Sequence, residues 1–546
     1  MPQKLPPHAI WIGERTELRA GATAFKEAVS NVGKPIYIVA HDEGPAITHH
    51  GTMVWGEPLI SNLPSEHLLG FAPPLPPANL GDPEFKKDLG LRYAYVVGAM
   101  ANGITSVELV RAAGEAGMIG FFGTGGLPLH QVERAIDRLS MYREVFPYGF
   151  NLIHSPSDPQ LESAVVDLFI SRGVQLVEAS AYLALTLPLV YFRVKGIHQR
   201  PDGCIVCPNR VVAKVSRVEV ASRFFAPPPP KMLNELVRLG KVTQSEAQLA
   251  GHIPLAQEIT GEADSGGHTD NRPALTLLPT FLSLRDEAMR RYQFNLRLRV
   301  GLGGGIATPE AAAAAFAMGA AYVLTGSINQ ACKQADTSQT VREMLGQAAQ
   351  ADVAMAPAAD MFEMGVKVQV LKRGTMFAMR AAKLYELYRN YDHYDQLPQQ
   401  ARTTVERDFL RSSFEQAWQQ TKLFFQKRDP SQIERAERDP KHQMALVFRS
   451  YLGQSSMWAK TGDPSRKMDY QIWCGPSMGA FNAWVKDSFL EDVTQRCAAT
   501  IGLNLLYGAA GLIRCSLLRN QGVTVPRPAA IFKPITMEEI EKRLQA

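Results

Sequence analysis

The sequence has no long apolar run. No stretch approaches the roughly 18 consecutive apolar residues that would indicate a membrane span. The opening segment, MPQKLPPHAIWIGERTE, lacks the apolar centre of a signal peptide. From these absences we expect a cytoplasmic protein without a membrane span.

Cysteine is also scarce, with six residues scattered through 546. Cys204 and Cys207 form a CxxC pair, but no second pair follows at the spacing of zinc ligands and no thioredoxin-like context surrounds it. A disulfide framework is typical of much smaller secreted domains. We therefore expect free thiols in a reducing compartment and no metal site.

Neither sign of charge dominates the composition. Lys and Arg number 58 and Asp and Glu number 53, which gives a formal net charge of +5. No basic block has the clustering that nucleic-acid binding requires, and no Rossmann fingerprint indicates a separate dinucleotide-binding domain. A nucleic-acid partner is therefore not expected, whereas an acidic protein partner is compatible with the charge.

Length and composition indicate a large core domain with attachments. A chain of 546 residues exceeds the usual size of one domain, and 46% hydrophobic with 20% charged residues is typical of globular proteins. We expect a small N-terminal α/β or β-rich domain with a linker at 1–85, a barrel at 86–375 with a helical insertion at about 227–257, and a helical C-terminal domain at 376–546.

From about Tyr93 onward, short apolar runs alternate with amphipathic helical segments, which is the pattern of parallel βα units. Eight runs qualify as strands, the number that a closed (β/α)8 barrel requires. They are 93–97, 119–123, 148–153, 175–178, 211–215, 258–261, 298–301 and 322–325. Helical periodicity is clearest at 105–116, 127–139, 309–318, 376–391, 401–425 and 490–514.

The strongest local signal is a pair of glycine-rich turns after the seventh and eighth strands. In a (β/α)8 barrel these two loops commonly bind a phosphate, because glycine lets backbone N–H groups approach the anion and a helix N-terminus adds a favourable dipole. The predicted cradle consists of Gly303, Gly304, Gly305, Gly326 and Ser327. Tight barrel turns without a ligand are the alternative interpretation.

His268 is the candidate for proton transfer. It follows the small residues of TGEADSGG at the end of the sixth strand. An imidazole at the C-terminal rim of a barrel strand lies at the barrel mouth, where it can donate a proton or a hydrogen bond. A purely structural histidine is the alternative.

Five motifs together resemble the nitronate monooxygenase and flavin enoyl-reductase superfamily. They are GAMANG at 98–103, YGFNLI at 148–153, EADSGGH at 262–268, GLGGGI at 301–306 and TGS at 325–327. The resemblance covers about 91–333 and implies a barrel that binds FMN.

A narrower resemblance covers nearly the whole chain. PNRVVAKVSR at 208–217, FEMGVKVQVLKRGTMFAMRAAKLYELY at 362–388 and WCGPSMGAFNAWVKDSFLE at 473–491 look like the PfaD-type, trans-acting enoyl reductases of polyunsaturated fatty acid and polyketide synthases. That resemblance implies FMN as cofactor and NADPH or NADH as co-substrate. It also implies that hydride reaches the β-carbon of a 2,3-enoyl thioester carried by an acyl carrier protein.

The resemblance further implies roles for individual residues. Ala99, Met100 and Asn102 would line the flavin after the first strand, and Asn151 after the third strand would contact its ring. The family's flavin loop and active-site histidine match Asp264, Ser265, Gly266, Gly267 and His268.

Lys214, on the fifth strand, would lie near the N1 and O2 edge of the flavin, where a cation stabilises the negative charge of reduced FMN. A structural ion pair with Glu178, at the end of the fourth strand, is the alternative. Both residues belong to the predicted cofactor-binding set.

The carrier partner that the resemblance implies is acidic, so basic residues of the helical domain are candidates for docking. They are Lys372, Arg373, Arg380, Lys383 and Arg389, with a solvated helix face as the alternative. Oxidation of nitronates by oxygen and a non-catalytic scaffold role remain rival functions. The size and apolar content favour a homodimer.

Overall fold

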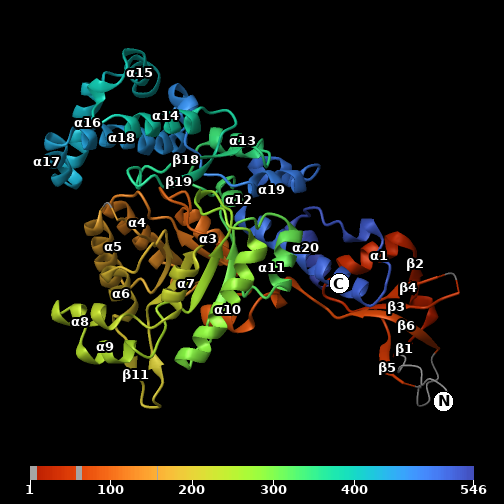
Figure 1. Cartoon of the computed structure of the whole chain (residues 1–546). Helices are drawn as coiled ribbons and strands as arrows, with labels where there is room; N and C mark the ends of the chain where they lie inside the picture. The colour runs from red at the N-terminus through yellow and green to blue at the C-terminus, as the bar shows by residue number, and fades with distance from the viewer. Residues whose placement is uncertain (1–8, 43, 57–63, 157, 546) are drawn as a thin grey trace, which may run out of the picture.

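The computed structural model describes residues 9–42, 44–56, 64–156 and 158–545. Its centre is a closed barrel of eight parallel strands (Figure 1). An N-terminal sheet lies to one side of the barrel, and a helical lobe lies above one of its ends (Figure 1). The predicted fold class is confirmed, because the barrel, the N-terminal unit, the helical insertion and the helical C-terminal region are all present.

Each of the eight predicted strands is a strand of the barrel, which closes in the order β10-β13-β14-β16-β17-β7-β8-β9. Their bounds are β7 Tyr95–Val97, β8 Ile119–Phe122, β9 Gly149–Ile153, β10 Leu176–Ser180, β13 Arg210–Val215, β14 Glu258–Glu262, β16 Arg299–Gly303 and β17 Val323–Thr325. Parallel pairing places Glu178 opposite Val212, so Lys214 projects from the same face of the sheet as Glu178.

Helices surround the barrel in the βα alternation. They are α2 Pro83–Leu89, α3 Val107–Glu115, α4 Leu129–Ser140, α5 Pro159–Ser171, α6 Leu187–Val194, α7 Val218–Phe225, α10 Ala274–Tyr292, α11 Pro309–Ala317 and the short α12 Ser327–Gln330. Helix α13 Gln339–Gly346 follows them and lies next to the lobe (Figure 1). Side chains cap the N-termini of several of these helices. For example, Thr308 Oγ1 accepts a hydrogen bond from Ala311 N at 3.4 Å at the start of α11, with Pro309 in the first turn.

The helical insertion predicted after the fifth strand consists of α8 Pro230–Arg238 and α9 Gln244–Ala250. Its second helix begins with a capping box between Thr243 and Glu246. A small hairpin, β11 His198–Gln199 with β12 Ile205–Val206, carries Cys204 on its exposed turn. Within the described residues no cluster of His, Cys, Asp and Glu could hold a metal ion.

The N-terminal unit is a six-stranded sheet in the order β2-β4-β3-β6-β1-β5, covered by α1 Gly21–Ser30. Its strands are β1 Ala9–Ile12, β2 Arg19–Ala20, β3 Ile36–Val39, β4 Ala46–Thr48, β5 Thr52–Trp55 and β6 Ser65–Ala72. Apart from β3, these strands are short or partly exposed and have little apolar periodicity, so the sequence does not reveal them individually.

The lobe above the barrel combines helices with a small antiparallel sheet in the order β15-β19-β18. The sheet consists of β15 Gly267–His268, β18 Val353–Pro357 and β19 Lys367–Leu371. The lobe helices are α14 Phe377–Asn390, α15 Gln399–Thr404, the π-helix η4 Val405–Leu410, α16 Phe414–Arg428, α17 Ser431–Arg438 and α18 Pro440–Thr461. The single helix predicted at 401–425 is wrong, because Arg411 adopts a left-handed conformation and Ser413 caps a new helix.

The last helices, α19 Ser477–Val485, α20 Ala498–Asn520 and α21 Met537–Gln545, lie beside the barrel rather than in the lobe. Helix α20 packs against α11 and α3, where α12, the helix that follows β17, is too short to cover the barrel. Gly502 brings it against Tyr95 of β7, and Gly508 brings it against Pro309 of α11. The domain limits given above remain predictions.

Helix α20 is also long and apolar enough to cross a membrane by length and composition, which the sequence pattern did not indicate. It has 23 residues and a mean hydropathy of 1.5 over its most apolar window, but 78% of that window is buried inside the protein. A helix in the core of a globular protein is expected to be apolar and buried in the same way.

Candidate functional site

A cavity of about 710 Å³ lies between the barrel and the lobe. Residues at the C-terminal end of every barrel strand line one side of it. The lobe closes the other side with residues such as Asp360, Phe424 and Arg449. Its volume lies within the range of about 300–1,000 Å³ that is usual for small-molecule sites.

The structure brings most of the predicted site residues together around this cavity. Those that line it are Ala99, Met100, Asn102, Asn151, Lys214, Ser265, Gly266, Gly267, His268, Gly303, Gly304, Gly305, Gly326 and Ser327. Two others stand back from it. Glu178 is fully buried behind Lys214, and the Asp264 carboxylate accepts a hydrogen bond from Asn271 Nδ2 at 2.7 Å.

The glycine turns leave an open hollow at the rim of the barrel. Gly304 and Gly305 have φ angles of +81° and +75°, which favour glycine over other residues. A Cβ on Gly304 would meet the backbone of Ala263 at 2.6 Å, whereas a Cβ on Gly305 or Gly326 would meet no protein atom within 4 Å. The space beside Gly305 and Gly326 is therefore free for another group.

A C-terminal segment packs against these turns. Gly475 N donates to Ser327 Oγ at 3.2 Å, and a Cβ on Gly266 would lie 2.9 Å from the backbone of Cys474. The WCGP motif therefore supports both the flavin loop and the second glycine turn predicted from the sequence.

Lys214 lies between two carboxylates. Its Nζ is 3.8 Å from Glu178 Oε2 and 3.6 Å from Glu262 Oε1. Burial alone would lower the pKa of Lys214, but the two carboxylates raise it by more than burial lowers it. The pKa of Lys214 therefore lies above its ordinary value. The ammonium group is a fixed positive charge in the wall of the cavity.

Glu178 and Asn151 hold the strand ends in place. Glu178 Oε2 accepts from Ala99 N at 3.1 Å, and Asn151 Nδ2 donates to Glu178 O at 2.9 Å and to Ser180 Oγ at 2.8 Å. Burial raises the pKa of Glu178, against the opposing effect of Lys214. The ion pair suggested as the alternative is therefore present in a wall of the cavity.

Asn102 connects the barrel to the lobe. Its φ is +58°, its Nδ2 donates to Ser456 Oγ at 2.9 Å, and its carbonyl accepts from Lys460 Nζ at 2.6 Å. Both partners lie on α18, so the side-chain amide and the backbone carbonyl of Asn102 link the barrel to the lobe.

His268 has a partner that the sequence did not indicate. Its Nε2 lies 3.2 Å from Asp360 Oδ1. Burial lowers the pKa of His268, but the adjacent Asp360 carboxylate more than offsets this effect, and Glu262 adds to it, so the pKa lies above 6.5. The pair favours an imidazolium that carries protons on both ring nitrogens.

The lobe sheet brings this pair together. His268 on β15 pairs with Val368 on β19, and Asp360 lies in the turn between β18 and β19. Arg449 on α18 holds that turn, because its Nε donates to Ala359 O at 2.9 Å and its Nη1 to Glu363 Oε1 at 3.1 Å. No local motif in the sequence marks Asp360 or Arg449 as site residues.

Comparison with known proteins agrees with this architecture. The family model described as nitronate monooxygenase matches residues 84–413, and the model of the inserted helical domain of [acyl-carrier-protein] S-malonyltransferase matches residues 391–470. The crystal structure of the enoyl reductase domain of MlnA, from the macrolactin biosynthesis cluster of Bacillus amyloliquefaciens, is 38% identical with a TM-score of 0.76. It covers 81% of this chain and 99% of that domain.

Longer relatives include a polyunsaturated fatty acid synthase subunit of Thraustochytrium sp. and the polyketide biosynthesis protein PksE of Bacillus subtilis, both 47% identical. The matches cover 81% and 80% of this chain, but only 30% and 56% of those relatives. The resemblance to PfaD-type enoyl reductases is confirmed, and the chain belongs to the nitronate monooxygenase family.

Proposed function

We propose that the chain is an FMN-dependent enoyl reductase that uses NADPH or NADH to reduce the 2,3 double bond of enoyl thioesters. The observation that carries the proposal is the convergence of an open glycine hollow, a buried cation and a paired histidine on one cavity. The family and the similarity to the MlnA domain support an oxidoreductase of the enoyl reductase type.

The residues around the cavity fit FMN. The space beside Gly305 and Gly326 accommodates a phosphate near backbone N–H groups, because no side chain occupies it. The other predicted lining residues, including Ala99, Met100 and Asn151, come from strand ends across the rim. When bound, FMN would supply hydride transfer from the nicotinamide to the β-carbon of the substrate.

Lys214 and His268 would provide the polar chemistry. The Lys214 ammonium stabilises negative charge that develops in the cavity during reduction. His268 donates a proton to the α-carbon of the substrate. Because Asp360 engages Nε2, the proton available to the substrate is the one on Nδ1. Asp360 and, through its turn, Arg449 are positioning residues for that step.

We also propose that the acyl chain arrives on an acyl carrier protein of a fatty acid or polyketide synthase, that the enzyme acts in trans in the cytoplasm, and that it forms a homodimer. The similarity to proteins of polyunsaturated fatty acid and polyketide synthesis supports the carrier, as does the likeness of 391–470 to a domain of an acyl-carrier-protein transferase.

Four of the five candidate docking residues, Lys372, Arg373, Lys383 and Arg389, are exposed. Arg380 is not available, because its Nη1 binds Asp469 and donates to Asp408 O at 3.0 Å. We therefore restrict the proposed carrier-docking set to the four exposed residues.

An absorption spectrum of the purified protein tests the proposal. We expect bound flavin, bleaching by NADPH under anaerobic conditions, and reoxidation by a crotonyl thioester. A colourless protein that takes up no FMN on reconstitution would favour a scaffold. Rapid oxygen uptake with a nitronate, without thioester reduction, would favour nitronate oxidation.

A further inference from the structure

A second, smaller pocket of about 180 Å³ lies in the lobe next to the main cavity. Three residues line both spaces, namely Gln420 on α16 and Ser450 and Gln454 on α18. Arg411 and Arg466 form the far wall of the smaller pocket. The two spaces therefore adjoin between α16 and α18, and the smaller one presents two guanidinium groups close to the main cavity.

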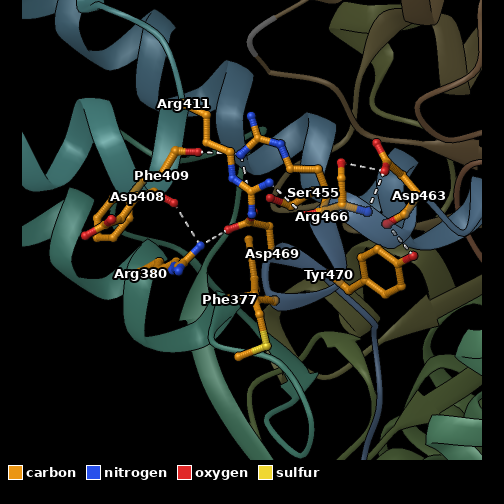
Figure 2. Close-up of polar contacts among 12 residues, drawn as sticks. Phe377, Arg380, Asp408, Phe409, Arg411, Ser455, Asp463, Arg466, Asp469 and Tyr470 are labelled. Atoms are coloured by element: carbon orange, nitrogen blue, oxygen red, sulfur yellow. Dashed lines mark hydrogen bonds and ion pairs between the residues drawn. The ribbon is translucent and has the colours of Figure 1, made fainter.

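The charge around this wall is not balanced. Figure 2 shows Arg380, Arg411 and Arg466 gathered around Asp469, which is fully buried. Arg411 Nη2 and Arg466 Nη1 lie 3.5 Å and 3.3 Å from Asp469 Oδ2, and Arg380 binds Oδ1. Three guanidinium groups thus share one carboxylate, which leaves two positive charges without a partner within this cluster.

Other carboxylates close to the cluster are engaged elsewhere. Asp408 binds the guanidinium of Arg407 at 2.8 Å, and Asp463 accepts hydrogen bonds from Ser465 N and Oγ at 2.9 Å and 2.7 Å. Neither forms an ion pair with the arginines of the pocket wall in the described part of the chain. The arginines therefore outnumber the carboxylates that form ion pairs with them at this wall, although Asp463 also interacts electrostatically with Arg466.

Both arginines are held by hydrogen bonds while retaining free donors. Arg411 Nη1 donates to Ser465 O at 2.7 Å. Arg466 donates to Phe409 O and Leu410 O at 2.8 Å each, and its guanidinium stacks 4.2 Å from the centre of the Trp458 ring. Each guanidinium has five N–H donors, so these contacts leave donors on both side chains for an anion.

We propose that Arg411 and Arg466 form a phosphate-binding subsite for a substrate of the main cavity. Two arginines side by side match the geometry of a phosphate, and the concave pocket brings their positive charges together. The proposal rests on the proposed function, because two substrates of that reaction carry a phosphate ester: NADPH at its adenosine ribose, and the phosphopantetheine arm of a carrier-bound thioester.

Matched substrate pairs that differ only in the phosphate test the subsite in the flavin-loaded full chain. One pair is NADPH and NADH, and the other is crotonyl-4′-phosphopantetheine and crotonyl-pantetheine. In Arg411→Gln we expect KM to rise roughly tenfold for the phosphorylated member of one pair, with kcat and the KM of its unphosphorylated partner unchanged. The pair that responds identifies the source of the phosphate.

Two further variants and a binding measurement complete the test. Arg411→Lys, which keeps the charge but loses the planar fork of donors, should weaken binding less than Arg411→Gln does. Arg407→Gln on the exposed side of η4 should change neither pair. Calorimetric titration with 2′,5′-ADP and with 4′-phosphopantetheine measures the subsite even if no thioester is reduced. Equal KM changes for both members of each pair, or unchanged binding of both probes in Arg411→Gln, would overturn the proposal.

Discussion

At the scale of single residues, the site depends on charges that are fixed before substrate arrives. Lys214 lies between Glu178 and Glu262, and His268 lies against Asp360. Each cation is stabilised by carboxylates in a setting where burial alone would favour the neutral form. The same pairing that raises the pKa of His268 lowers that of Asp360, although burial opposes the latter effect.

The His268–Asp360 pair predicts a shift in pH dependence. The folded-state pKa of His268 lies above 6.5, so the pair is fully formed below about pH 6.5 and is lost as pH rises through the folded-state pKa. Asp360→Asn lowers that pKa, and we expect the alkaline limb of the kcat profile for enoyl reduction to move to lower pH. Steady-state rates across pH measure the shift.

The control for this prediction is the double variant. In His268→Gln the basal rate is lower, and adding Asp360→Asn should change neither rate nor profile further, because the carboxylate acts through the ring. If Asp360→Asn moves the alkaline limb equally in the wild-type protein and in His268→Gln, the assigned role of Asp360 is contradicted.

At the scale of elements, the site is built by turns that follow β16 and β17 and by segments that pack onto them. Gly304 allows the first turn to approach Ala263, whereas Gly326 in the second turn faces open space. The backbone of Gly475 then caps Ser327. Protein atoms thus constrain the first turn at Gly304, whereas the second turn leaves open space at Gly326.

Gly326→Ala tests whether a phosphate occupies that space. The added methyl meets no protein atom within 4 Å, so the free energy of unfolding of the flavin-free protein should change by less than about 1 kcal/mol. We expect the Kd for FMN, measured by fluorescence titration, to rise about tenfold, which corresponds to about 1.4 kcal/mol.

Gly453→Ala is the matched control on the opposite wall of the cavity, since its Cβ also meets no protein atom within 4 Å. It should leave the Kd for FMN unchanged. Equal weakening by both variants, or none by Gly326→Ala, would remove the phosphate from the second glycine turn.

At the scale of the whole molecule, α20 joins the barrel to the N-terminal unit. It packs against α11, α3 and β6, and Arg514 near its C-terminal end donates to the carbonyls of Val29 and Asn31 at 3.2 Å and 3.0 Å. The helix therefore completes the barrel wall and holds the sheet beside it. We expect the barrel and the N-terminal unit to unfold together.

Gly508→Val tests this coupling. A Cβ at Gly508 would lie 2.7 Å from Pro309, so valine forces α20 away from α11 and should lower the free energy of unfolding by about 1–3 kcal/mol in chemical denaturation. Ser516→Val places the same residue on an exposed face of the helix and should change stability by less than about 0.5 kcal/mol. Similar losses in both variants would show that the loss does not come from the contact with Pro309 and would contradict this role of α20.

The barrel could be predicted from the sequence because its signals are local. Apolar runs, turn glycines and caps such as Thr308 each act within a few residues, and parallel strands bring their C-terminal ends to one rim whatever the detailed packing. That rule explains why Asn151, Lys214 and Gly304, predicted from separate motifs, line one cavity.

The sequence by itself determined the eight strands, the glycine turns and the histidine at the rim. Only the tertiary structure decided that Asp360 lies against His268, that Arg411 and Arg466 line a pocket next to the cavity, and that α20 closes the barrel wall. These pairings join segments far apart in the chain through side-chain packing and shared charge, and none of them leaves a periodic or local pattern in the sequence.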